Sequence, residues 1–302
     1  MMKPQDLRAR LQGVISFPVT PFAQDLSLDL DGLRKNLAHN ARFPFCAVVA
    51  AGGTGELYSL DVDEHRQVVA ATVAAFAGKA PVIAGVGGSL AVARTMAREA
   101  AAAGADGILA LPPLYADPPD EGLVAYYRAI ADATPLGMLI YSRDWFKPGP
   151  AMVAKLAEAI PTLVAWKDGQ ADLRRYQLIR QAVGDRLAWI GGAGDDMVPG
   201  YYAIGIRTYT SSIATISPAL ALALDKAAAA GDSTTLLGLM ERYVTPLYAL
   251  RARKRGYEVT AMKAAMDVVG FAGGAVRPPL PTLPTSEREE LAAMMAGWSA
   301  YL

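Results

Sequence analysis

The 302-residue sequence contains one cysteine and only two histidines. The single cysteine, Cys46, excludes an intrachain disulfide framework and is typical of a protein of the reducing cytoplasm. His39 and His65 lie far apart in the sequence, and neither belongs to a metal-ligand spacing. This scarcity of soft ligands argues against a zinc or iron site, so we expect no bound metal.

An excess of charge and long apolar runs are also missing. The 29 basic and 29 acidic residues balance to a net charge of zero, whereas a nucleic-acid-binding protein normally has a basic excess or stripe. The alanine-rich residues 218–231 are interrupted by Asp225 and Lys226, and no stretch reaches roughly 18 uninterrupted apolar residues. The charged N-terminal segment does not resemble a signal peptide. We therefore expect a soluble cytoplasmic protein without nucleic-acid or membrane partners.

Short apolar runs alternate with longer amphipathic segments along most of the chain. Continuous apolar strands are typical of a parallel sheet that is covered on both faces. The predicted strands are residues 14–19, 46–51, 81–86, 107–111, 136–141, 162–167, 187–191 and 206–213. The predicted helices are residues 31–42, 63–76, 89–103, 120–133, 150–160, 172–183, 197–204 and 218–230.

Eight successive strand–helix pairs predict an α/β fold, a closed (β/α)₈ or TIM barrel over residues 1–232. An open doubly wound sheet is the alternative, and it usually carries a glycine fingerprint after its first strand. The first strand here leads instead into Thr20-Pro21-Phe22, which cannot form such a loop. The closed barrel is therefore preferred.

The strand pattern stops after the eighth pair, and residues 233–302 form a predicted helical extension. Three additional C-terminal helices are expected over residues 234–251, 258–269 and 286–298. Their apolar residues need a partner, which is either the outer helices of the barrel or another subunit. These residues are Leu237, Met240, Val244, Met262, Met266 and Met294.

Reactive side chains in such a barrel lie at the carboxyl ends of its strands. The sixth strand ends in Lys167. Partial desolvation there would lower the pKa of this lysine, so that the neutral amine is available as a nucleophile. The fifth strand ends in Tyr141, a possible proton carrier, and Arg143, whose donors suit a carboxylate. Each residue also has a structural interpretation: Lys167 and Arg143 each precede an aspartate that would pair with them, and Tyr141 would suit the core.

Two glycine-rich loops and one polar strand complete the candidate pocket. Gly53 and Thr54 belong to a loop after the second strand, whose backbone N–H groups and hydroxyl suit a carboxylate. Gly192 belongs to a similar loop after the seventh strand, and Ser211 is one of several hydroxyl residues on the eighth. Each signal is weak alone, because glycine turns and β-branched residues also have purely structural uses.

Taken together, these residues resemble the superfamily of dihydrodipicolinate synthase and N-acetylneuraminate lyase, which are Schiff-base barrels. The sequence Gly52-Gly53-Thr54-Gly55-Glu56 is similar to the superfamily's loop motif, Tyr141 to its strand-five tyrosine and Lys167 to its Schiff-base lysine. Within the superfamily the chain most resembles the 5-dehydro-4-deoxyglucarate dehydratases. The segments that carry this resemblance are residues 13–22, 52–57, 141–144 and 166–169.

The resemblance implies a decarboxylating hydro-lyase that acts on a dicarboxylate sugar acid and needs no metal or organic cofactor. It implies that Lys167 is the nucleophile and Tyr141 the proton shuttle. It also implies that Gly53 and Thr54 seat the keto-acid carboxylate and that Arg143 holds the distal one. Gly192 and Ser211 would line the pocket.

The resemblance further implies a homo-oligomer, either a dimer or a tetramer. In such an assembly Tyr115 would reach the site of a neighbouring subunit. The synthases usually carry a second threonine where Gly53 stands, and they relay protons through its hydroxyl. The resemblance therefore disfavours condensation by that relay.

Three alternatives to this interpretation stay open. One is another lysine-dependent barrel enzyme, such as an aldolase that cleaves a different 2-keto-3-deoxy sugar acid. A non-catalytic sugar-acid-binding homologue is the second, although sensing needs no amine nucleophile. A metal-dependent barrel enzyme is the third and weakest.

Overall fold

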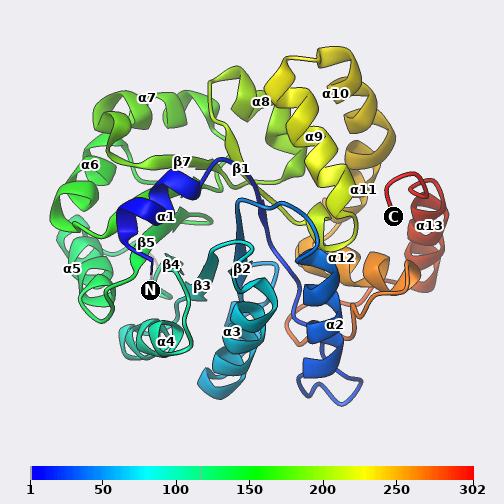
Figure 1. The fold of residues 1–302 in the computed structure, drawn as a ribbon, viewed down its shortest axis with the longest axis horizontal. Coiled ribbons are helices and arrows are strands. Elements are labelled where there is room, and N and C mark those ends of the chain that lie inside the picture. Colours follow the sequence, from blue (N-terminus) through cyan, green and yellow to red (C-terminus); the bar gives the residue numbers. More distant parts are fainter. Residues whose placement is uncertain (1, 116) are drawn as a thin grey trace.

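The computed structural model describes residues 2–115 and 117–302, which fold as a closed barrel of parallel strands surrounded by helices (Figure 1). Over these residues the strands pair in chain order, and β8 pairs with β1 to close the ring. The strands are β1 (Gly13–Ser16), β2 (Ala47–Ala50), β3 (Val82–Val86), β4 (Gly107–Ala110), β5 (Gly137–Ser142), β6 (Leu163–Asp168), β7 (Ala188–Gly191) and β8 (Thr208–Ser211). The predicted barrel is confirmed, because β1 and β8 would not pair with each other in an open sheet.

A helix follows each strand and packs on the outside of the barrel, as the amphipathic patterns predict. These helices are α2 (Leu30–Asn40), α3 (Val62–Phe76), α4 (Leu90–Ala102), α5 (Asp120–Ala131), α6 (Pro150–Ala159), α7 (Leu173–Val183), α8 (Val198–Ala203) and α9 (Pro218–Ala230). Several begin at a capping side chain; Asp61 and Glu64, for example, form a reciprocal capping box at the start of α3. Such caps satisfy backbone N–H groups that the helix itself leaves unpaired.

One helix was not predicted from the sequence. Helix α1 (Pro4–Arg10) crosses one end of the barrel, as Figure 1 shows. Leu7 is fully buried there against Gly107 and Gly137, the first residues of β4 and β5. Helix α1 therefore covers the amino ends of these strands and leaves the other end of the barrel for the site.

The first predicted C-terminal helix is interrupted. It consists of α10 (Ser233–Leu239), a π-helical turn over Met240–Val244, and α11 (Thr245–Arg251). Pro246 explains the change, since proline lacks the N–H that an uninterrupted α-helix would need there. The chain then continues into α12 (Tyr257–Val268) and α13 (Thr285–Ala296).

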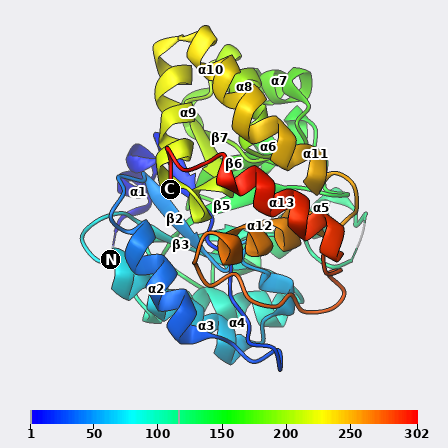
Figure 2. The same cartoon turned by 90° about the vertical axis from the view of Figure 1, so that its right-hand side faces the viewer.

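The C-terminal helices bury most of their apolar side chains within the chain itself. Met240, Val244, Met262 and Met266 are at most 9% exposed and share a core with residues of α9. Figure 2 faces this side of the molecule, where α11, α12 and α13 lie close together. Leu237 is the exception among the expected core residues, since it is 61% exposed.

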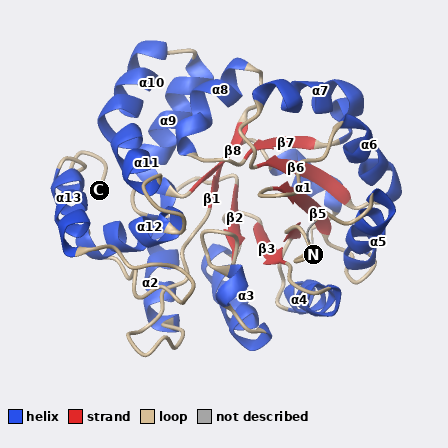
Figure 3. Ribbon diagram, turned by 180° about the vertical axis from the view of Figure 1, so that it is seen from behind, coloured by secondary structure: helices blue, strands red, loops and turns tan. Residues whose placement is uncertain are grey.

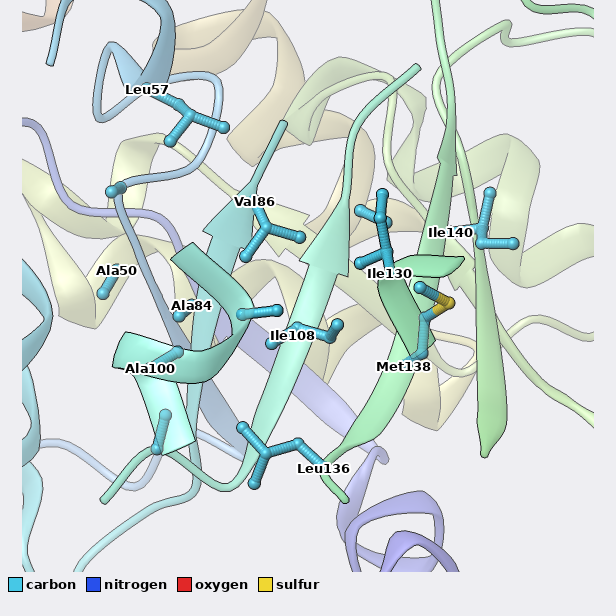
Figure 4. Close-up of a cluster of buried hydrophobic side chains, with 14 of the residues drawn as sticks. Ala50, Leu57, Ala84, Val86, Ala100, Ile108, Ile130, Leu136, Met138 and Ile140 are labelled. Atoms are coloured by element: carbon cyan, nitrogen blue, oxygen red, sulfur yellow. The ribbon is translucent and has the colours of Figure 1, made fainter. Parts of the chain in front are cut away.

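Two apolar layers hold the barrel strands. An outer layer lies between strands and helices, and Figure 4 shows part of it, with Val86, Ile108 and Ile140 pointing from their strands. An inner layer fills the barrel, and it includes Ile83, Leu109, Leu139, Ala165 and Ile190. The alternation of side chains along β6 puts Trp166 in the outer layer, so that Lys167 points inward.

Candidate active site

A cavity of about 580 Å³ opens at the carboxyl ends of the strands. In Figure 3, which views the barrel from behind, α11 and α12 lie at one side of the strands. The lining combines residues from strand ends and loops with residues from the C-terminal helices and the segment after them. From the barrel these are Phe17, Gly53, Thr54, Tyr58, Tyr141, Arg143, Asp144, Lys167, Gly169, Gly192, Ala193, Gly194, Thr210 and Ser212. From the C-terminal region they are Arg251, Arg255, Gly256, Glu258, Val259, Pro279 and Leu280.

Lys167 is the buried amine of this cavity. It is paired in register with Tyr141 on β5, and its side chain is 2% exposed. Its Nζ donates a 2.8 Å hydrogen bond to the carbonyl oxygen of Gly192. Burial, with the positive charge of Arg143 as a second cause, holds the pKa of Lys167 well below the usual value for lysine. A larger fraction of the amine is therefore neutral, the form that attacks a ketone.

Tyr141 supplies a hydroxyl beside that amine. The Tyr141 hydroxyl donates a 3.2 Å hydrogen bond to the same Gly192 oxygen, and Lys167 Nζ lies 3.2 Å from the centre of the Tyr141 ring. Burial raises the pKa of Tyr141, so the phenol keeps its proton at neutral pH. The pair therefore offers one nucleophile and one proton donor side by side.

The site leaves no room for a side chain at Gly192. A Cβ atom placed on Gly192 lies only 2.7 Å from Lys167 Nζ. A side chain here would displace the amine from the Gly192 carbonyl oxygen, which accepts hydrogen bonds from both Lys167 and Tyr141.

Arg143 lies next to the loop that follows β2. A Cβ atom placed on Gly53 lies 2.8 Å from Arg143 Nη1, so the missing side chain of Gly53 leaves room for the guanidinium group. Arg143 Nε also donates a 2.8 Å hydrogen bond to Asp144 Oδ2. The sequence-based expectation assigned Gly53 and Arg143 to opposite ends of a substrate, whereas the structure brings them together.

A buried ion pair fixes the same loop from the C-terminal region. Glu56, which has a left-handed backbone (φ 54°), pairs with Lys263 of α12, and both side chains are at most 1% exposed. Lys263 Nζ also donates a 2.6 Å hydrogen bond to the carbonyl oxygen of Ala275. Lys263 was missed in the sequence, since nothing in the local pattern of a buried helix indicates which distant loop it contacts.

Ser211 does not line the cavity. Its side chain is fully buried, and its hydroxyl donates to Asp195 instead. Asp195 also accepts a 2.9 Å hydrogen bond from the Tyr248 hydroxyl of α11. The neighbouring Thr210 and Ser212 face the cavity from this side. Alternation along β8 explains the difference between Thr210 and Ser211, because adjacent strand residues point to opposite sides, whereas Ser212 lies beyond the end of the strand.

Tyr115 lies away from the cavity of its own chain. It is 76% exposed and follows Leu114, which is 78% exposed. Its expected role in a neighbouring subunit stays a prediction.

Across the described residues, 2–115 and 117–302, no group of three or more His, Cys, Asp or Glu side chains is arranged to hold a metal ion. The described helices also include none that is both long and apolar enough to cross a membrane.

Comparison with known proteins identifies the family. The model of the Dihydrodipicolinate synthetase family matches residues 10–297. The chain belongs to this family. A relative in Rhizobium meliloti (strain 1021), named probable 5-dehydro-4-deoxyglucarate dehydratase, is 38% identical over 297 residues, which is 97% of this chain and 98% of the relative. A relative of the same name in Methylobacterium radiotolerans is 40% identical over 297 residues, with the same coverage.

Solved structures of the family agree with the fold. Dihydrodipicolinate synthase from Oceanobacillus iheyensis superposes with a TM-score of 0.91 at 27% identity, over 99% of this chain and 100% of that one. The sialic acid aldolase of Ruminococcus gnavus gives a TM-score of 0.89 at 22% identity, over 97% and 100% of the two chains, which supports the fold alone. The family predicted from the sequence is confirmed, and with it the prediction of an enzyme of the lyase class.

Proposed function

We propose that the chain converts 5-dehydro-4-deoxyglucarate to 2,5-dioxopentanoate, carbon dioxide and water through a Schiff base on Lys167. The observation that supports this most strongly is a buried amine of lowered pKa, hydrogen-bonded to the same carbonyl oxygen as a protonated phenol. The relatives in Rhizobium meliloti and Methylobacterium radiotolerans carry the name of this dehydratase, which supports the choice of substrate.

The first steps use the two groups that share the Gly192 oxygen. Lys167 Nζ attacks the ketone carbon, and Tyr141 passes a proton to the oxygen, which leaves as water. The resulting iminium withdraws electrons and acidifies the neighbouring methylene. Loss of one methylene proton and of the β-hydroxyl as water then gives a conjugated iminium.

The same electron sink serves the decarboxylation. The bond to the distal carboxylate breaks, carbon dioxide leaves, and the electron pair moves along the conjugated chain to the iminium nitrogen. Proton uptake and hydrolysis then release the keto-aldehyde and restore the Lys167 amine. The water consumed in hydrolysis balances the one lost when the iminium formed, so the net products are one carbon dioxide and one water.

The carboxylate next to the ketone would bind at the loop after β2. Gly53 and Thr54, whose N–H groups and hydroxyl are donors, line the cavity there, and the Arg143 guanidinium lies against Gly53. Charge-assisted hydrogen bonds to these donors would orient the ketone toward Lys167.

We also propose that residues 233–302 complete the pocket of the barrel. We further propose that the chain forms a homo-oligomer, a dimer or a tetramer, and that it is a cytoplasmic protein. Adjacent large side chains as exposed as Leu114 and Tyr115 are typical of an interface, here with a second copy of the chain. The free thiol of Cys46 suits a reducing compartment. Sedimentation analysis of the wild type and of Tyr115→Ser tests the interface, and an unchanged mass distribution would contradict it.

Incubation with 5-dehydro-4-deoxyglucarate tests the proposed reaction. We expect carbon dioxide and 2,5-dioxopentanoate in a one-to-one ratio, measured by gas evolution and product mass. Pyruvate and an aldehyde without carbon dioxide would indicate an aldolase, and binding without turnover would indicate a sugar-acid-binding protein. Either result would contradict the proposal.

A further inference from the structure

The C-terminal helices place a second arginine in the cavity wall. Arg251 is the last residue of α11, and its guanidinium carbon lies 4.1 Å from the centre of the Tyr248 ring. Its Nη1 atom donates a 3.1 Å hydrogen bond to the Ser212 hydroxyl, which also faces the cavity. Two contacts on different sides therefore hold the guanidinium group in one place.

Arg251 has hydrogen-bonding capacity to spare. Among the described residues its Nε atom is buried and has no hydrogen-bond partner. A buried donor without a partner is unfavourable, so the protein's own groups do not fully satisfy the guanidinium group. Arg143, in contrast, already donates its Nε to the carboxylate of Asp144.

Other groups near Arg251 leave this end of the cavity suited to an anion. The carboxylate of Glu258 accepts a 2.6 Å hydrogen bond from the backbone of Gly256. Arg255, which is exposed, adds a second positive charge to the wall. Two acids, Asp195 and Asp196, also lie near Arg251, and burial raises the pKa of both, while the positive charge of Arg251 opposes that shift. The oxygens of Asp195 accept from Ser211, Tyr248 and the backbone.

The loop after β7 connects Arg251 to the reacting amine. Gly192 of this loop accepts from Lys167, and a Cβ atom placed on Gly194 lies 2.8 Å from the hydroxyl of Tyr248, on whose ring Arg251 stacks. Two residues of extended chain span at most about 7 Å. Lys167 and Arg251 both line the same cavity, so a diacid whose ketone is at Lys167 would extend toward Arg251.

We infer that Arg251 binds the distal carboxylate of the substrate, the one that leaves as carbon dioxide, and that it thereby selects diacids over monoacids. This inference rests on the proposed function, and it assigns to Arg251 the role that the sequence alone gave to Arg143. Arg143 then belongs to the keto-acid end, beside Gly53.

A pair of keto acids that differ only at the distal end tests the assignment. Binding of 2-oxoadipate, a six-carbon diacid, and of 2-oxohexanoate, its monoacid counterpart, is measured by calorimetry. We expect Arg251→Gln to weaken 2-oxoadipate binding by about 10- to 100-fold and to leave 2-oxohexanoate nearly unchanged, because a charged hydrogen bond is lost only with the diacid. We expect Arg143→Gln to weaken both ligands together, because both carry the keto-acid carboxylate.

Two further variants separate binding from structure and from general charge. Arg251→Lys keeps the charge and should recover part of the preference for the diacid. Lys254→Ala removes a nearby exposed cation that does not line the cavity, and it should bind both acids as the wild type does. A diacid preference that survives Arg251→Gln, or that is lost in Arg143→Gln instead, would overturn the inference. These binding measurements need no turnover, so failure of the proposed reaction would be seen separately, in the wild type with 5-dehydro-4-deoxyglucarate.

Discussion

The Nζ atom of Lys167 lies 3.2 Å from the centre of the Tyr141 ring, and both side chains donate to the Gly192 oxygen. The register between β5 and β6 produces this contact, since it pairs the two residues directly. An aromatic face favours a nearby cation, but burial outweighs this effect and lowers the pKa of Lys167. The amine is thus held in place in a form that can react.

Replacing Tyr141 with phenylalanine removes the hydroxyl and keeps the ring. We expect kcat to fall by about 100- to 10,000-fold, the usual contribution of a positioned proton donor, with a small change in KM. Steady-state kinetics measures this. Tyr127→Phe is the matched control, because that buried tyrosine lies between α5 and the barrel, away from the cavity. Equal activity of Tyr141→Phe and the wild type would remove the hydroxyl from the mechanism.

Replacing Arg143 with glutamine should shift the pH dependence of activity. The positive charge of Arg143 lowers the pKa of Lys167, so its removal raises that pKa. The neutral amine is the reactive form, and the acid limb of kcat/KM should therefore move to higher pH. Arg66→Gln, on the exposed face of α3, should leave the limb in place. A shift to lower pH would contradict this electrostatic account.

Replacing Gly53 with alanine tests the space that it leaves for Arg143. The added Cβ would lie 2.8 Å from Nη1, so the flexible guanidinium group must move. We expect an unchanged melting temperature and a kcat/KM lower by about 10- to 100-fold, the value of one charged hydrogen bond. Gly149→Ala is a suitable control, since its added Cβ meets nothing within 4 Å. Wild-type kinetics in Gly53→Ala would show that the approach of Arg143 has no role.

The Glu56–Lys263 ion pair should contribute to stability as a unit. Glu56→Gln or Lys263→Met alone leaves one buried charge without its partner, which costs about 3–5 kcal/mol of unfolding free energy. The double variant should lose less than the sum of the two single losses. Urea denaturation of the four proteins measures this coupling. Additive losses would show that the two charges do not stabilise one another.

The barrel could be predicted from the sequence because its signals are local. Short apolar strands, amphipathic helices and their caps each depend on neighbouring residues. Lys167 and Tyr141 could be singled out because a reactive side chain at the end of an apolar strand is conspicuous. The interruption before Pro246 also had a local signal, the proline itself, although the predicted helix ran through it.

The other half of the cavity could not be predicted in this way. Arg251 and Lys263 come from helices far along the chain, and only tertiary packing brings them to the strand ends. The position of Arg143 against Gly53 likewise depends on a contact between loops 90 residues apart in sequence. Ser211 was expected in the lining, but strand alternation turns its side chain toward Asp195.

Reduction with borohydride in the presence of 5-dehydro-4-deoxyglucarate or 2-oxoadipate, followed by peptide mapping, tests the covalent amine most directly. We predict one modified peptide, with the added mass on Lys167, and none in a folded Lys167→Met variant. A modification on another lysine, or none in the wild type at saturating keto acid, would contradict the account.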